Sequence, residues 1–152
     1  MPSEKVVVGW REWLSLPELG VDRIKAKIDT GARSSAIHAF DVVEYHRAGR
    51  HWLRFNLHPL QRSSDVIVPA RARVLDRREV RSSTGHLHLR WLIRTEVVLA
   101  GQRFPIELTL SRRDEMGFRM LLGRQALRGR FVVDPGRSFV SDPRRRRARR
   151  QA

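Results

Sequence analysis

Residues 23–32 read Arg-Ile-Lys-Ala-Lys-Ile-Asp-Thr-Gly-Ala and are one of the two most informative segments of the chain. Apolar residues alternate with basic residues as far as the aspartate at position 29. An alternation with a period of two is typical of a β-strand that buries one face. Asp and Gly are common turn formers, so Asp29-Thr30-Gly31 predicts a turn directly after this strand. The stretch therefore places a carboxylate at the end of a half-buried strand.

A second informative segment, Leu121-Leu122-Gly123-Arg124, lies far along the chain from the first. It combines an apolar pair with a glycine. The residues from 124 to 128 predict a short helix, because Gly129 follows them and glycine commonly ends a helix.

The remaining apolar patterns predict an all-β fold. Further strands are expected at His51–Leu57, Val66–Val68, Arg71–Leu75, Gly85–Leu99, Gln102–Leu110 and Phe131–Val133. A second short helix is expected at Trp10–Leu14. Strands this short and this closely spaced favour a closed or sandwiched antiparallel architecture.

Length and composition favour one domain. The chain has 152 residues and is 41% hydrophobic, which suits a single compact core. We expect this domain to span residues 1–140 and a basic tail to span residues 141–152. The segment Arg144–Arg150 contains six arginines and no apolar face, so we expect the tail to be disordered and dispensable for folding. The chain has no cysteine, which excludes disulfides and thiolate metal sites.

Targeting signals are not recognisable in the sequence. No apolar run approaches the roughly 18 residues that a membrane-spanning helix requires, and no secretory apolar segment follows the first methionine. We therefore expect a cytoplasmic protein without a membrane partner.

Charge is the largest compositional bias. The sequence has 31 Lys and Arg against 16 Asp and Glu, a formal net charge of +15. Such a field attracts polyanions, so nucleic acid is a candidate partner through the basic surface and the tail. An acidic peptide would be attracted equally, and scattered arginines can also serve solubility alone. The four tryptophans are expected in the core or at interfaces rather than as stacking platforms for bases.

The two segments together resemble the active-site signature of retropepsin-like aspartic proteases. Longer stretches resemble a narrower family, often labelled an ATP-dependent zinc protease, whose members are frequently encoded beside a RimK-type ATP-grasp ligase. The further stretches that carry this resemblance are Gly9-Trp10-Arg11-Glu12, Leu16-Pro17-Glu18-Leu19-Gly20, Val80-Arg81-Ser82-Ser83-Thr84-Gly85-His86, Glu107-Leu108-Thr109-Leu110 and Met116-Gly117-Phe118-Arg119-Met120. The resemblance covers roughly Val8 to Val140. The sequence contains neither a Walker-type phosphate loop nor a His-Glu-x-x-His zinc motif.

This resemblance implies a retropepsin-like closed barrel with one short helix near the C-terminal part. Aspartic proteases use two neighbouring carboxylates that share one proton. Only Asp29 lies in an Asp-Thr-Gly motif, so the resemblance implies a symmetric homodimer with one aspartate from each chain. Thr30 would then brace the paired loops, Gly31 would allow close backbone approach, and Ala32 would complete the loop. The expected supporting residues behind the loop are Leu121, Leu122, Gly123 and Arg124. Alternatively, the aspartate merely caps a turn.

Retropepsins cover their substrate with a mobile β-hairpin. The best candidate for its tip is Ser82-Ser83-Thr84-Gly85, because small residues and a glycine allow both a turn and motion. An ordinary surface hairpin is the alternative. Arg33 and Arg81 are the candidate substrate contacts.

His86 and His88 are expected to share one face of a strand. Two histidines at this spacing can bind zinc, but a zinc site requires at least a third ligand. No other histidine or carboxylate lies at the spacing of a recognisable zinc motif. We expect no metal and no cofactor.

The function that the sequence favours is aspartic-type peptide hydrolysis by a homodimer with Asp29 as the catalytic carboxylate. The association with a ligase that adds glutamates to a ribosomal protein implies that acidic, glutamate-rich peptide tails are the substrate. Two alternatives remain open, namely a non-catalytic nucleic-acid- or ribosome-binding β-barrel, and a metallopeptidase that uses His86 and His88.

Overall fold

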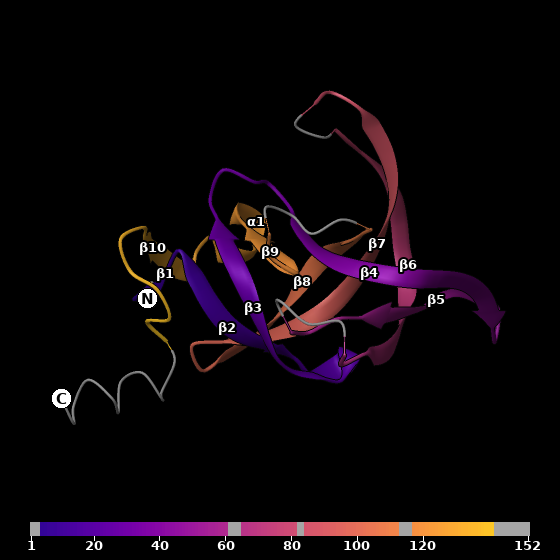
Figure 1. Cartoon of the computed structure of the whole chain (residues 1–152), viewed down its shortest axis with the longest axis horizontal. Coiled ribbons are helices and arrows are strands. Elements are labelled where there is room, and N and C mark those ends of the chain that lie inside the picture. The colour runs from indigo at the N-terminus through magenta and orange to yellow at the C-terminus, as the bar shows by residue number, and fades with distance from the viewer. Residues whose placement is uncertain (1–3, 61–64, 82–83, 113–116, 142–152) are drawn as a thin grey trace.

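The computed structural model describes residues 4–60, 65–81, 84–112 and 117–141, which form an almost entirely β structure (Figure 1). Its helices are a single 3-10 turn, η1 (Pro17–Leu19), and one short α-helix, α1 (Arg124–Leu127). The strands are β1 (Val6–Gly9), β2 (Arg11–Leu16), β3 (Val21–Asp29), β4 (Ser35–Arg47), β5 (Arg50–Leu57), β6 (Val68–Arg81), β7 (Leu87–Leu99), β8 (Gln102–Ser111), β9 (Met120–Gly123) and β10 (Phe131–Asp134). The prediction of an all-β fold with one short helix near the C-terminal part is confirmed.

Eight of the described strands form one sheet that curves into a ring. Their order is β2-β3-β9-β4-β5-β6-β7-β8, and additional pairings of β2 with β7 and of β4 with β8 close the ring. Large apolar side chains such as Phe55, Leu108 and Met120 are fully buried inside it. Strands β1 and β10 pair with each other as a separate two-stranded sheet beside the ring (Figure 1).

The expected antiparallel architecture is only partly correct. Strand β9 lies between β3 and β4, parallel to β3 and antiparallel to β4. The pairs β4–β8 and β1–β10 are also parallel. Because β9 is inserted from the far end of the chain, Gly123 is paired directly with Asp29. This insertion brings together the two segments that the sequence analysis singled out.

Several predicted element boundaries are wrong. The helix expected at Trp10–Leu14 is absent: the residues from Arg11 onward form strand β2, where Glu12, Leu14 and Leu16 are buried at a period of two. Of the expected strand Val66–Val68 only Val68 is in a strand, where it begins β6, and the expected strand Arg71–Leu75 is the middle of that same strand.

Strand β4 was not predicted at all. Its first three residues are all buried, so they show no alternation, and an irregularity follows between Phe40 and Val43. Asp41, inside this irregularity, has a positive φ of 53°. A pattern search with a period of two cannot follow a strand through such a break.

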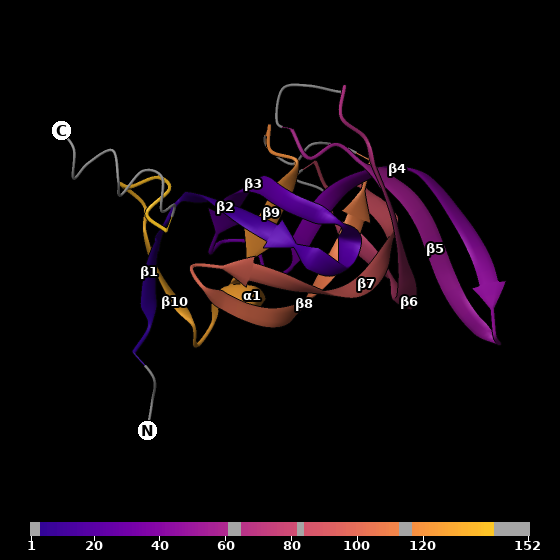
Figure 2. The ribbon, with the colours of Figure 1, turned by 90° about the horizontal axis from the view of Figure 1, so that it is seen from below.

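Two hairpins extend from the ring. Hairpin β4–β5 runs away from the body of the molecule in both views (Figures 1 and 2). Hairpin β6–β7 extends toward the side on which the β3–β4 loop lies in Figure 1. No helix among the described residues is long and apolar enough to cross a membrane.

A buried carboxylate fastens the last described segment to the ring. Glu12 is 0% exposed. Its oxygens accept hydrogen bonds from the backbone N–H groups of Gly9 (2.7 Å), Val140 (2.9 Å) and Ser141 (3.1 Å), and from the Ser141 hydroxyl (2.7 Å). A buried charge needs such partners, because burial without them is strongly unfavourable. Glu12 therefore ties the segment before residue 142 to strand β2.

Candidate active site

Asp29 is the last residue of β3, and its side chain organises the turn that follows. The Gly31 N–H donates a hydrogen bond to the Asp29 Oδ1 atom at 2.9 Å. The Ala32 N–H donates to the Asp29 carbonyl oxygen at 3.3 Å. Asp29 is half-buried, whereas Thr30 and Gly31 are exposed. The turn therefore holds a carboxylate in a fixed position at the surface of the single chain.

The segment at the start of α1 holds this loop from behind. The backbone N–H of Arg124 donates to the carbonyl oxygen of Ala32 at 2.8 Å, and that of Gln125 donates to the carbonyl oxygen of Arg33 at 3.2 Å. Leu121 and Leu122 are buried in β9 beside the strand that carries Asp29. Backbone hydrogen bonds of this kind fix the loop independently of its own sequence.

Gly123 is the point of closest approach between β9 and the loop. A Cβ atom at this position would lie 2.5 Å from the carbonyl oxygen of Ser34 and 2.9 Å from that of Ala32. Both contacts are with backbone atoms, which cannot relieve a clash by changing rotamer as a flexible side chain could. Any side chain here would push the Asp29 loop away from its support.

The Arg124 side chain also contacts the loop. Its Nη1 atom lies 3.2 Å from the carbonyl oxygen of Gly31 and 3.5 Å from that of Thr30. Arg124 is exposed, so these hydrogen bonds contribute little to stability. Their role is to orient the carbonyl groups of the turn that follows Asp29.

Sequence reasoning missed two supporting residues, Ser35 and Thr109. The Ser35 hydroxyl accepts a hydrogen bond from the Gly123 N–H at 3.0 Å, and the Ser35 carbonyl oxygen accepts one from the Thr109 hydroxyl at 3.2 Å. Both residues are 3% exposed. A serine and a threonine in an apolar strand give no signal of their own. Long-range pairing, which sequence does not reveal, gives them partners: β9 lies beside β4 at Ser35, and β8 brings Thr109 next to the Ser35 carbonyl.

The other predicted substrate contacts lie on exposed segments. Arg33 is exposed in the loop after it, and Arg81 is exposed at the end of β6. Thr84 and Gly85 lie in the connection between β6 and β7, and Gly85 has the positive φ of 84° that a tight turn favours. The expected hairpin is therefore present, while Ser82 and Ser83 lie outside the described residues.

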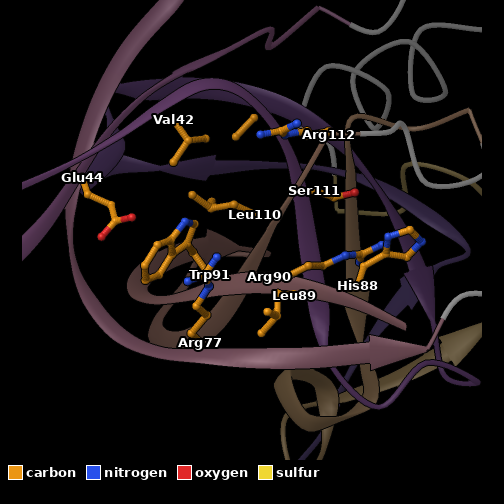
Figure 3. Close-up of a pocket in the computed structure, with 11 residues that line it drawn as sticks. Val42, Glu44, Arg77, His88, Leu89, Arg90, Trp91, Leu110, Ser111 and Arg112 are labelled. Carbon is orange, nitrogen blue, oxygen red and sulfur yellow. The ribbon is translucent and has the colours of Figure 1, made fainter. Parts of the chain in front are cut away.

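A basic cavity of about 530 Å³ lies between hairpin β6–β7, strand β4 and the end of β8 (Figure 3). Its charged and titratable lining residues are Arg77, His88, Arg90, Arg112 and Glu44. The guanidinium of Arg77 lies 4.6 Å from the centre of the Trp91 ring, which fixes it by a cation–π contact. The side chain of Glu44, the single carboxylate in this lining, lies within hydrogen-bond distance of the Nε2 atom of His51, at 3.0 Å. The cavity therefore favours negatively charged groups.

The described residues give no support to the metal alternative. His88 lines the cavity, and His86 precedes β7 and is exposed. Within the described ranges, no three His, Asp or Glu side chains are grouped closely enough to hold a metal ion.

An Asp-Thr-Gly turn braced by an apolar-apolar-Gly strand, in an all-β ring, defines a retropepsin-like protein. Consistently, the chain belongs to the RimB-like family, described as the retropepsin-like aspartic endopeptidase RimB, which matches residues 7–144. Members of this family are hydrolases, so the sequence-based assignment to an aspartic peptidase family is confirmed.

Curated relatives carry a different name. The chain is 44% identical over 139 residues to a probable alpha-L-glutamate ligase of Shewanella halifaxensis, a match that covers 91% of this chain and 30% of that protein. A protein of the same name from Parasynechococcus marenigrum is 47% identical over 133 residues, covering 88% of this chain and 28% of that protein. The chain thus spans less than a third of the length of these relatives.

A solved structure confirms the fold. The protein Lpg0085 of Legionella pneumophila, described as a protein of unknown function (DUF785), superimposes with a TM-score of 0.74 at 23% sequence identity. The match covers 91% of this chain and 100% of that one.

Proposed function

We propose that this protein hydrolyses peptide bonds as a symmetric homodimer in which the two Asp29 carboxylates meet at the twofold axis. The observation that carries the proposal is the position of Asp29 in a rigidly supported turn whose next residues, Thr30 and Gly31, are exposed. A peptidase of this class needs two adjacent carboxylates. One chain supplies a single Asp-Thr-Gly turn, so a second copy is the natural source of the other carboxylate.

The proposed chemistry divides one proton between the two carboxylates. The ionised Asp29 takes a proton from a water molecule, whose oxygen attacks the peptide carbonyl carbon. The protonated Asp29 of the second chain gives its proton to the carbonyl oxygen. When the resulting tetrahedral diol collapses and the C–N bond breaks, the first Asp29 gives the proton that it took from water to the leaving nitrogen. The second Asp29 takes a proton back from a hydroxyl group of the diol as the new carboxylic acid forms.

The neighbouring residues have positioning roles in this proposal. The Thr30 side chain makes no hydrogen bond to the other described residues, so it is available to a partner loop. Gly31 and Ala32 form the turn that fixes Asp29. The support behind the turn consists of Leu121, Leu122, Gly123 and Arg124.

The proposed substrate is an acidic, glutamate-rich peptide tail. The basic cavity supplies three arginines to receive carboxylates, and arginine is the side chain best suited to bind them in pairs of hydrogen bonds. The curated relatives, in which a region like this chain belongs to a protein named for L-glutamate ligation, support the same substrate class. We propose that the peptidase unit covers residues 1–140 and that it acts in the cytoplasm, where a glutamate-tailed ribosomal protein is found.

The separation between the Asp29 loop and the basic cavity determines how far from the scissile bond a substrate side chain would be recognised. Strand β4 begins at Ser35, beside the Asp29 loop, and Ala39 on the same strand lines the cavity. Four residues of extended strand span about 13 Å. An extended substrate that followed β4 would place a side chain three or four residues from the scissile bond in the cavity.

The proposal is tested with two peptides that differ only in a terminal run of glutamates or glutamines, and cleavage is followed by mass spectrometry. We expect cleavage of the glutamate peptide and a KM for it that rises about tenfold in Arg77→Gln, because a hydrogen bond to a charged group contributes about 1.5–3 kcal/mol. Arg94→Gln, outside the cavity, is the matched control. Equal cleavage of both peptides would refute the acidic specificity, and cleavage of neither would refute the proposed substrate class.

A further inference from the structure

The outer face of the sheet formed by β4, β5 and β6 carries an unusual concentration of arginine. Cross-strand pairing places Tyr45 opposite Trp52, and Trp52 opposite Arg73. Residues two positions apart share a face of a strand. The members of this arginine face are Val43, Tyr45, Arg47, Arg50, Trp52, Arg54, Arg71 and Arg73. The alternate residues Leu53, Ala70 and Ala72 are buried on the inner side.

All five guanidinium groups of the arginine face are exposed, and none forms an ion pair with another described residue. Glu44 is the one carboxylate in segments 43–47, 50–54 and 69–73. It lies on the opposite face of β4, where it lines the basic cavity. The arginine face therefore presents positive charge, and its own members include no carboxylate.

This arrangement is unfavourable for the isolated protein. Arg47 is paired across the strands with Arg50, and Arg54 with Arg71. Like charges directly opposite each other destabilise a sheet. Elsewhere in the molecule such a pair is relieved, since Arg78, opposite Arg90, forms an ion pair of 3.4 Å with Glu107. A bound polyanion would relieve the repulsion on the arginine face.

Two aromatic rings lie among the arginines. The rings of Tyr45 and Trp52 are inclined by only 19° with centres 6.4 Å apart, and both are half-buried. A hollow of about 200 Å³ beside them is lined by these rings and by Arg47, Arg50, Arg71 and Ala48. Aromatic rings on a sheet surface can stack unpaired bases, while arginines bind the phosphates between them.

From these features we infer that the arginine face is a binding surface for single-stranded RNA. A duplex hides the faces of its bases from such rings, and RNA is the nucleic acid that cells keep mainly single-stranded. Phosphate contacts would use the planar guanidinium groups, which fit phosphate oxygens in pairs of hydrogen bonds. Because this surface lies on the side of the sheet opposite the basic cavity, the inference is independent of the proposed peptidase reaction.

The test measures binding of the full chain to a fluorescein-labelled oligouridine of about twelve nucleotides, a length within the usual site sizes. We expect Arg54→Ser/Arg71→Ser to weaken binding at least tenfold. The plot of log association constant against log salt concentration has a negative slope, and loss of two phosphate contacts should make that slope less steep by about 1.4. The matched control, Arg94→Ser/Arg128→Ser, removes the same charge from exposed positions elsewhere and should change affinity by less than about twofold. Equal loss in both variants, or loss in neither, would overturn the inference.

Base stacking is tested separately with Trp52→Leu, whose folding is first checked by thermal melting. We expect this variant to lose at least about fivefold in affinity for oligouridine, because one stacked base contributes about 1–3 kcal/mol. Its affinity for heparin, a polyanion without bases, should not change. Equal losses for both ligands, no loss for oligouridine, or displacement of the RNA by an oligoglutamate peptide of equal charge would each contradict an RNA surface.

Discussion

At the scale of single residues, Gly123 determines whether the Asp29 loop can rest on β9. We expect Gly123→Ala to lower the free energy of unfolding by about 3 kcal/mol, because the added Cβ would meet the Ser34 backbone at 2.5 Å. Gly136→Ala is the matched control, since its Cβ would lie 3.5 Å from the nearest atom, at an ordinary contact distance. Urea denaturation of both variants measures the difference. A loss for Gly123→Ala no greater than for the control would show that the loop does not need this approach.

The sequence was informative about residues whose role is local and uninformative about residues whose role depends on long-range pairing. The turn at Asp29 follows from its own tripeptide, and its hydrogen bond to Gly31 is local. Ser35 and Thr109 support the site only because β8 and β9 lie beside β4. Trp52, expected in the core or at an interface, is half-buried on an outer face because strand pairing sets its direction.

At the scale of the elements, alternation identified the regular strands and failed where a strand is irregular or buried on both faces. Strand β5 was predicted to within one residue, since Leu53, Phe55 and Leu57 alternate with more exposed residues. Strand β4 begins with three buried residues and then bulges, so its pattern was not recognised. Parallel pairing of β9 with β3 joins distant segments, and no local propensity encodes it.

The connection of strand β2 to the segment 137–141 depends on one carboxylate. We expect Glu12→Ala to lower the free energy of unfolding by about 3 kcal/mol, because it removes the carboxylate that accepts the buried Gly9 N–H and the hydrogen bonds of the Ser141 N–H and hydroxyl. Glu18→Ala is the control, since Glu18 is exposed and its side chain accepts a hydrogen bond from the Glu96 N–H. Urea denaturation should show a loss below about 1 kcal/mol for this control. Equal losses would mean that Glu12 does not fasten the segment.

At the scale of the whole molecule, the proposal requires self-association. We expect sedimentation velocity to show a monomer–dimer equilibrium that shifts with protein concentration, because one chain carries only one Asp-Thr-Gly turn. Retention of full peptidase activity by a strictly monomeric species would exclude a site shared between two chains.

The central claim, that hydrolysis uses Asp29 from both chains of a dimer, is tested most directly by mixing. The parent protein and Asp29→Asn are combined in equal amounts in urea and refolded together, and hydrolysis of the glutamate peptide is measured with and without EDTA. The amide keeps the shape of the carboxylate but cannot accept the proton of the water molecule. We expect no activity for Asp29→Asn alone and no effect of EDTA. In the mixture we expect half the activity per parent chain, because half of the parent chains then pair with an inactive partner. Unchanged activity per parent chain in the mixture, or activity in Asp29→Asn alone, would contradict the claim.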